Sequence, residues 1–150
     1  DALKDFSGKQ PRGWLSPALT ETFETVDILQ EEGFEYVTDW VLDDQPVELK
    51  TRSGSLVNIP YTQENNDVGM MLIQHHKASE YTDRALDQFE TLYEESADQP
   101  RVMALSCHPY IFGVPHRIKY FRKIYEELRK KPGVCFWTGS QILDWYLNQK

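Results

Sequence analysis

The sequence predicts an α/β protein built on a mostly parallel sheet, and two observations carry this prediction. Short apolar runs without a helical period alternate with amphipathic segments along the chain, which is typical of a parallel sheet with helices on its faces. No repeat, low-complexity tract or linker interrupts the 150 residues, so they predict a single domain, residues 1–150. Length alone favours a small open sheet, because a closed βα barrel typically takes roughly 250 residues.

The first half of the chain is expected to hold strands, a helix and a hairpin. Ser16 and Pro17 are typical of a helix opening, and Gly33 is typical of a helix end. Two runs joined at Arg52-Ser53-Gly54 predict the hairpin. The expected elements are a short helix at 2–6, a strand near 12–15, a continuous or broken helix up to 33, a strand at 34–38, a loop at 39–46, and hairpin strands at 47–50 and 55–59.

The second half is expected to alternate helices with buried strands. Helical periodicity predicts helices at about 79–96 and 115–130, and Thr138 with Gln141 matches a capping box ahead of a last helix at 142–147. Apolar runs at 102–105 and 134–137 predict buried strands. Residues 65–77 fit neither period.

A histidine follows the strand expected at 102–105. Pro109 cannot donate to a central ladder, so the strand ends as His108 is reached. In α/β folds, sites are built at the carboxyl ends of strands, and an imidazole exchanges a proton near neutral pH. His108 is therefore either a proton-transfer group or a residue that closes a loop.

Charge and cysteine content limit the class of protein. A net charge of −8 argues against nucleic-acid binding, and the one basic stretch, from Arg117 to Lys131, fits a solvated helix face. Cys107 and Cys135 lie in or beside apolar runs, which favours reduced, buried thiols over a disulfide framework, although a bridge stays conceivable if their strands are neighbours. The sequence shows no signal peptide and no apolar run long enough to cross a bilayer, so we expect a cytoplasmic protein without a membrane partner.

Several short motifs, each weak alone, occur in a specific order over nearly the whole chain. This order resembles the C-terminal half of the polysaccharide deacetylase superfamily (the NodB-like homology domain), and the branch it most resembles is that of the cytoplasmic allantoinase-like proteins of purine catabolism. The motifs are Arg12-Gly-Trp-Leu-Ser-Pro17, Tyr36-Val-Thr-Asp-Trp40, Asp43-Asp-Gln-Pro46, Lys50-Thr-Arg-Ser-Gly54, Gln74-His-His76, His108-Pro-Tyr110, Gly113-Val-Pro-His-Arg117 and Phe136-Trp-Thr-Gly139.

The resemblance implies a partial (β/α) barrel of the polysaccharide deacetylase type, with about four strand–helix units plus a β-hairpin. It implies a hydrolase of non-peptide C–N (amide) bonds, acting on an N-acetylated sugar or on the cyclic amide of a ureide such as allantoin. The alternative is a non-catalytic half-barrel that serves as an interaction module, because exposed sheet edges favour association. The expected partners are a small-molecule ureide or N-acetylated sugar, and either a second copy or the remainder of the barrel.

The family's general base is an aspartate from the earlier part of the barrel, joined in metal-using members by a further Asp and a His-x-x-x-His pair. Here the histidines stand at 75, 76, 108 and 116, and no pair has metal-ligand spacing on a helix face. We therefore expect no metal ligand in this chain; the cofactor is either a divalent metal held by residues upstream or none. We interpret the chain as a fragment that begins inside a mid-barrel helix and is inactive when isolated.

The resemblance also assigns roles to individual residues. His108 matches the late-strand histidine and is expected to be the general acid. Asp39 matches an aspartate that hydrogen-bonds a catalytic partner, here Arg12, and its alternative is a loop cap. Arg12 either orients a carboxylate or carbonyl of the substrate or is a surface arginine. Trp14 is expected in the pocket wall rather than in the core, and Trp40 beside the substrate.

The remaining candidates carry weaker expectations. On an extended chain only one of His75 and His76 can face the pocket, and we expect His76 to contact substrate rather than metal. Asp43 and Asp44 fit a solvated turn. Cys107 is expected to be structural, and His116 exposed or capping a helix.

Overall fold

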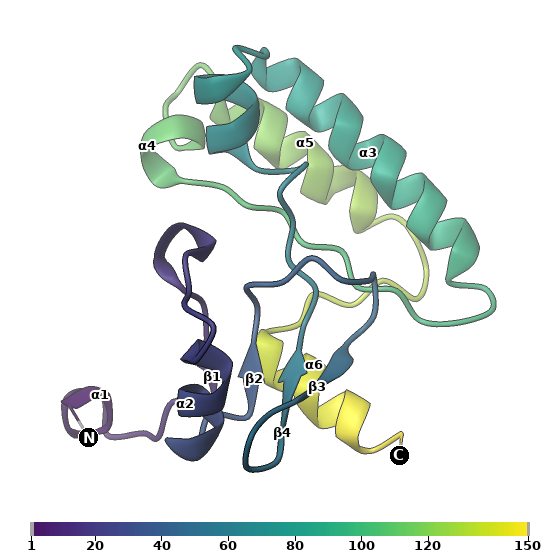
Figure 1. The fold of residues 1–150 in the computed structure, drawn as a ribbon. Helices are drawn as coiled ribbons and strands as arrows, with labels where there is room; N and C mark the ends of the chain where they lie inside the picture. The colour runs from purple at the N-terminus through teal and green to yellow at the C-terminus, as the bar shows by residue number, and fades with distance from the viewer. Residues whose placement is uncertain (1, 150) are drawn as a thin grey trace. The chain divides into compact units, whose positions relative to one another are not determined.

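The computed structural model describes residues 2–149, and these form two compact units (Figure 1). The first contains the described residues up to Pro60 together with those from Trp137 onward, and the second runs from Tyr61 to Phe136. The description of residues 1–150 as a single domain stays a prediction. Within the described residues, every helix is too short or too polar to cross a membrane.

The first unit is built on a mixed sheet whose strands lie in the order β1-β2-β4-β3. β1 is parallel to β2 and β2 to β4, while β3 and β4 form the antiparallel hairpin that the sequence predicts. The α/β class and the hairpin are therefore confirmed, although β1 and β2 are shorter than expected. The strands are β1 (Gly13–Trp14), β2 (Tyr36–Val37), β3 (Val47–Lys50) and β4 (Ser55–Asn58).

Helices pack on both faces of this sheet. Neighbouring side chains of β4 point to opposite faces, and each is buried by a different helix. Leu56 packs in a cluster with Leu29 of a helix, whereas Val57 packs with Leu143 of another. The helical elements of the first unit are α1 (Ala2–Ser7), the 3₁₀ turn η1 (Pro17–Leu19), α2 (Thr25–Glu31) and α6 (Gly139–Leu147).

The ends of these helices follow the expected signals in two places out of three. Thr138 and Gln141 form the predicted capping box at the start of α6. Gly33 has a positive φ of 84°, as a left-handed helix stop requires. Ser16 does not cap a helix, because its hydroxyl accepts a hydrogen bond from Trp14 Nε1 at 2.9 Å. The helix expected up to residue 33 is broken, since η1 is separated from α2.

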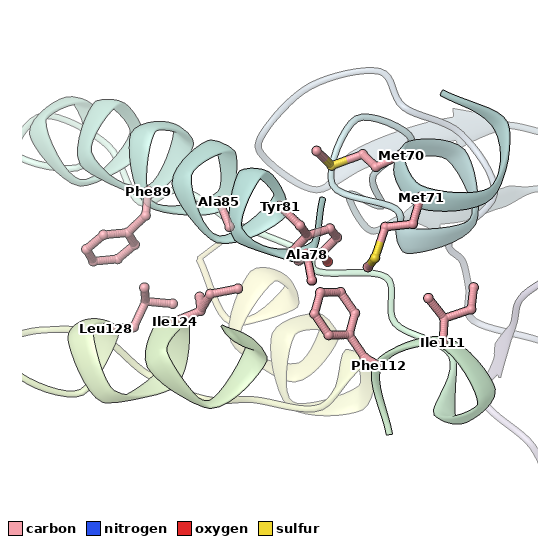
Figure 2. Close-up of a cluster of buried hydrophobic side chains, with 10 residues drawn as sticks. All are labelled: Met70, Met71, Ala78, Tyr81, Ala85, Phe89, Ile111, Phe112, Ile124 and Leu128. Atoms are coloured by element: carbon pink, nitrogen blue, oxygen red, sulfur yellow. The ribbon is translucent and has the colours of Figure 1, made fainter. Parts of the chain in front are cut away.

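The second unit packs two long helices against each other (Figure 1). Their facing sides bury the cluster drawn in Figure 2, in which Tyr81, Ala85 and Phe89 lie opposite Ile124 and Leu128. The unassigned segment 65–77 contains a π-helical turn that buries Met70 and Met71. The elements of this unit are η2 (Val68–Ile73), α3 (Ala78–Glu95), α4 (Pro109–Phe112) and α5 (Ile118–Leu128).

Two strand predictions are wrong for the described residues. Neither 102–105 nor 134–137 forms a strand, and the parallel bridge between Asn66 and Ser106 lies just after the first of these runs. An apolar run indicates burial, but a strand also needs a neighbour whose backbone pairs with it. Cys107 and Cys135 are free and exposed, so their expected burial is also wrong.

Candidate functional site

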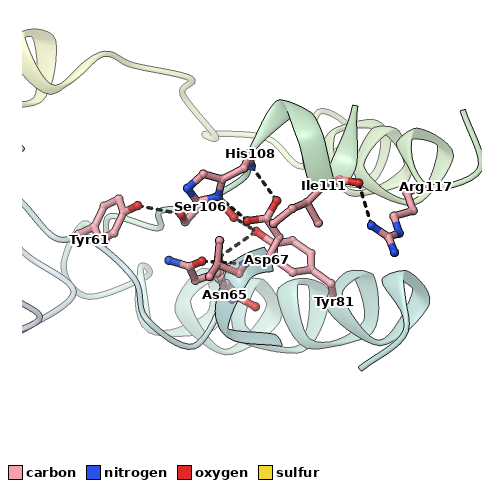
Figure 3. Close-up of polar contacts among 10 residues, drawn as sticks. Tyr61, Asn65, Asp67, Tyr81, Ser106, His108, Ile111 and Arg117 are labelled. Carbon is pink, nitrogen blue, oxygen red and sulfur yellow. Dashed lines mark hydrogen bonds and ion pairs between the residues drawn. The ribbon is translucent and has the colours of Figure 1, made fainter. Parts of the chain in front are cut away.

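A histidine–aspartate pair lies in the second unit (Figure 3). His108 Nδ1 is 2.6 Å from Asp67 Oδ1, and the backbone N–H of His108 donates to Asp67 Oδ2 at 2.7 Å. The Asp67 side chain is fully buried, whereas 39% of the His108 side chain is exposed. A buried carboxylate thus holds both the ring and the backbone of an accessible histidine.

Short backbone segments bring the two residues together. The parallel bridge between Asn66 and Ser106 sets the two segments side by side, with the Asp67 N–H donating to the Ser106 carbonyl at 3.2 Å. Pro109 opens α4 and leaves His108 at its N-cap position in an extended conformation. Pro109 therefore ends the extended segment, as the sequence predicts, and places His108 at the site.

A buried tyrosine spans the same two segments from α3. The Tyr81 hydroxyl lies 2.9 Å from the Asn65 carbonyl and 3.0 Å from the Ser106 carbonyl, so its proton is shared between residues that flank the pair (Figure 3). Burial raises the pKa of Tyr81, which keeps the hydroxyl protonated as a donor. Tyr61 donates to the Ser106 hydroxyl at 2.7 Å and so contacts the same segment.

The geometry of the pair selects one tautomer of the histidine. A carboxylate only accepts hydrogen bonds, so the proton between Asp67 Oδ1 and His108 lies on Nδ1. Nε2 is then the atom that takes up or releases a proton. Within residues 2–149, Nε2 of His108 makes no hydrogen bond. The pair can therefore hold an imidazolium whose Nε2–H is presented to a reacting group.

Two carboxylates of the first unit are incompletely satisfied. Asp39 is buried, with its Oδ1 accepting the Ser16 N–H at 2.7 Å, and Glu21 accepts a hydrogen bond from Trp40 Nε1. The second oxygen of each has no hydrogen-bond partner among the described residues. Burial, and then the charge of Asp39, raises the pKa of Glu21.

The expected contact between Arg12 and Asp39 is wrong. The Arg12 guanidinium instead binds Glu35 through two hydrogen bonds, at 2.6 and 3.0 Å, and Asp144 at 2.7 Å. These carboxylates raise the pKa of Arg12, and the guanidinium in turn lowers the pKa of Asp144. Arg12 therefore joins the start of the sheet to α6, and a role in substrate binding stays a prediction.

The tryptophans of the first unit are held in defined places. Trp14 packs edge-on against Phe34, with ring centroids 5.6 Å apart, beside the cluster around Leu56. Trp40 packs against the same cluster, and Asn58 fixes its backbone by accepting from its N–H at 3.3 Å and donating to its carbonyl at 2.9 Å. Trp14 and Trp40 are thus both partly buried beside this cluster, and their expected places in the pocket wall and beside the substrate stay predictions.

The neighbouring histidines of the second unit do not lie on an extended chain. His75 has a positive φ of 59° and is exposed, so the extended geometry assumed for this pair is wrong. His76 is half-buried, with its Nδ1 3.6 Å from Glu80 Oε1, and it lines a pocket. The exposed Asp43 accepts the N–H of Asp44, as in the solvated turn that was predicted.

The described residues do not by themselves offer the ligand set of a metal centre. Among residues 2–149, no group of three or more His, Cys, Asp or Glu side chains could hold a metal ion. The Asp67 carboxylate uses both oxygens on His108, and Arg12 neutralises the carboxylates beside it. No chemical step is therefore assigned to a metal in this chain.

Sequence reasoning missed Asp67, Tyr81 and Glu21. A signal for Asp67 exists: the run Asn65-Asn66-Asp67 follows the last strand of the hairpin, where α/β folds place polar site residues. Tyr81 resembles any core aromatic of an amphipathic helix, and nothing in the sequence relates Glu21 to Asp39. Only these contacts in the folded chain reveal the roles of Tyr81 and Glu21.

The sheet order, the hairpin and the helical second unit are those of a partial (β/α) barrel of the polysaccharide deacetylase type. A probable polysaccharide deacetylase from Pseudomonas aeruginosa PAO1 superposes with a TM-score of 0.87 at 24% identity, covering 98% of this chain and 50% of that one. The Puue allantoinase superposes with a TM-score of 0.85 at 26% identity, covering 95% and 48%. The resemblance stated from the motifs is therefore confirmed.

Sequence comparison agrees with the structural neighbours. A peptidoglycan deacetylase of Helicobacter pylori is 25% identical over 181 residues, which cover 99% of this chain and 61% of that protein. No protein-family model matches the chain. The chain thus spans about half to three-fifths of the length of these relatives, which fits the C-terminal half of such a barrel.

Proposed function

We propose that this chain supplies the C-terminal half of the active site of a carbon–nitrogen hydrolase, with His108 as the general acid. The observation that carries the proposal is the pairing of buried Asp67 with half-exposed His108. The deacetylase and allantoinase relatives support the reaction class, because removal of an N-acetyl group and opening of a cyclic ureide both break an amide C–N bond.

The chemistry expected of the chain's own residues is proton transfer to the leaving nitrogen. Water, activated by a base outside this chain, adds to the amide carbonyl carbon and forms a tetrahedral intermediate. When the C–N bond breaks, its electron pair stays on nitrogen and the Nε2 proton of His108 moves to that atom. Asp67 accepts the Nδ1–H throughout and stabilises the imidazolium before the transfer.

A ureide such as allantoin is the proposed substrate. The Puue allantoinase is the solved neighbour named here with the higher sequence identity. The second candidate substrate is an N-acetylated sugar or peptidoglycan, favoured by the Helicobacter pylori relative.

The test is substrate consumption by the native-length protein, with allantoin and an N-acetylated sugar oligomer assayed in parallel, each with and without a chelator. Turnover of allantoin supports the ureide proposal, and turnover of the sugar alone moves the assignment to the second candidate. His108→Ala is expected to lower turnover roughly 10²- to 10⁴-fold, the usual contribution of a positioned acid. His75→Asn is the matched control, because His75 is exposed and asparagine tolerates its positive φ.

Two results would contradict the proposal. Unchanged turnover in His108→Ala would remove the general-acid role. Amide hydrolysis by the isolated 150 residues would show that no residue outside this chain is needed as a base. If the native-length protein hydrolyses neither substrate, the half-barrel is better explained as a non-catalytic interaction module.

A further inference from the structure

The second unit contains a pocket whose lining is rich in nitrogen groups. Its volume is about 430 Å³, within the range of small-molecule sites. The lining includes neither Asp67 nor His108, so the proposed proton transfer does not take place in it. The lining residues are Met71, His76, Lys77, Ala78, Ser79, His116, Arg117 and Tyr120.

The charge of this lining is opposite to that of the protein. The whole chain carries a net charge of −8, yet the lining holds Lys77, Arg117 and two imidazoles, and no carboxylate. Lys119 adds a cation beside the pocket, with its Nζ 4.9 Å from the centre of the Tyr120 ring. A concentration of positive groups in a concave site raises the local concentration of anions.

Glu80, which contacts two residues of the lining, is already engaged. The Glu80 carboxylate accepts the Lys77 N–H at 2.5 Å and lies 3.6 Å from His76 Nδ1. The hydrogen bond from the Lys77 N–H, together with the nearby His76 and Lys77 side chains, lowers the pKa of Glu80. The Glu80 carboxylate is therefore ionised and interacts with these two residues. It offsets part of the positive charge but leaves Lys77 and Arg117 able to bind a ligand through their side chains.

The groups of the lining are held in place by the fold. Arg117 Nη1 donates to the Ile111 carbonyl at 3.3 Å, which orients a guanidinium that still has other N–H donors (Figure 3). Ala78 and Ser79 form the first turn of the long helix α3, where backbone N–H groups favour negative charge. Met71 and Tyr120 supply apolar surface between the polar groups.

We infer that this pocket binds a small organic anion through a carboxylate or phosphate group, held by Lys77 and Arg117 with the apolar part against Met71 and Tyr120. Both oxyanions match the planar fork of an arginine and the point charge of a lysine. The inference is separate from the proposed proton transfer, because neither Asp67 nor His108 lines this pocket.

The test is a titration of the native-length protein, labelled with ¹³C at the methionine methyl groups, with acetate and with inorganic phosphate at constant ionic strength. The Met71 methyl lies in the lining and is expected to shift saturably, whereas the Met103 methyl lies outside it and should not move. A Met71→Leu variant assigns the reporter signal. Saturation by acetate alone assigns a carboxylate ligand, saturation by phosphate alone a phosphate ligand, and saturation by both supports the shared oxyanion site.

Matched variants distinguish binding in this pocket from a general electrostatic attraction of anions to the protein surface. Lys77→Gln is expected to weaken the titration about fivefold, the usual effect of losing one partly exposed charge contact. Lys123→Gln removes the same charge from an exposed position of α5 outside the lining and should leave it unchanged. Arg117→Gln should weaken binding as well, but it also releases the Ile111 contact, so Lys77→Gln decides. Absence of a saturable Met71 shift, or equal weakening by Lys77→Gln and Lys123→Gln, overturns the inference.

Discussion

Replacement of Asp67 by asparagine would test the proposed proton-transfer pair while preserving the size of the side chain. Asp67 accepts two hydrogen bonds from His108, one from Nδ1–H at 2.6 Å and one from the backbone N–H at 2.7 Å. An asparagine oxygen can replace only one of these acceptors. If it keeps the backbone contact, its amide NH₂ faces Nδ1 and forces that atom to become an acceptor. The tautomer then reverses, and Nε2 carries the proton in the neutral ring.

The structure sets the size of the expected effect. The Asp67 side chain is fully buried and holds the Nδ1–H of His108, so its replacement removes the contact that orients the ring and fixes its tautomer. A positioned acid contributes roughly 10² to 10⁴ in rate, and we expect kcat of Asp67→Asn to fall within that range. Hydrogen bonds to charged groups contribute about 1.5–3 kcal/mol, so the free energy of unfolding should fall by a similar amount.

Two measurements follow this variant. Nitrogen NMR of the His108 ring reports whether Nδ1 or Nε2 is protonated, and it needs no substrate. Steady-state hydrolysis by the native-length protein reports kcat. Asp83→Asn is the control, because Asp83 is exposed on α3 in the same unit. An unchanged tautomer, or unchanged kcat, would refute the reasoning from geometry.

A double variant sharpens the same test. If Asp67 acts only through His108, then Asp67→Asn added to His108→Ala should slow the reaction no further, because residues that act as a unit are strongly non-additive. Independent, multiplying effects would show that Asp67 has a separate role.

Three further predictions concern the groups around the candidate sites. Tyr81→Phe should lower the free energy of unfolding by about 1 kcal/mol. Because the pKa of Tyr81 is raised in the folded chain, the stability that its hydroxyl contributes is complete below the ordinary pKa of about 10 and is lost at higher pH. Denaturant titrations should therefore show the difference from wild type shrinking in alkali, and a constant difference would contradict the prediction. Glu21→Gln should stabilise the chain by roughly 1 kcal/mol or less at neutral pH. Because the pKa of Glu21 is raised in the folded chain, ionisation of this carboxyl destabilises the fold as the pH rises, so thermal melts should show a smaller stabilisation by the variant in mild acid. A stabilisation that does not depend on pH would exclude the ionisation of Glu21 as its cause. Arg12→Gln should raise the pKa of Asp144 toward about 3.9, the ordinary value, and a carboxyl NMR titration that still shows a lowered pKa would exclude Arg12 as its cause.

Local signals in the sequence predicted the elements that depend on neighbouring residues. Helical spacing of apolar residues gave α3 and α5 nearly to their ends, and the capping box at Thr138 marked the start of α6. The turn at residues 52–54 predicted the β3–β4 hairpin, whose strands are close in the chain. Helix periodicity, helix caps and hairpin turns depend on residues that are close together in the sequence, so they can be predicted from the sequence alone.

Predictions that depended on distant partners succeeded less often. The apolar runs at 102–105 and 134–137 predict strands that do not form, because strand pairing requires backbone donors and acceptors from another segment. For the same reason, neither the Glu35 and Asp144 partners of Arg12 nor the Ser16 partner of Asp39 could be inferred from spacing. A charged residue shows its chemistry in the sequence, but its partner is decided by folding.

The sequence by itself determined the fold class and singled out His108, because a short apolar run ended by proline indicates where an α/β chain places a functional side chain. Only the tertiary structure decided that Asp67, far away in the sequence, meets that histidine and is buried beneath it. The physical reason is that the orientation of an imidazole depends on a hydrogen bond across space, while sequence periodicity describes only contacts along the chain.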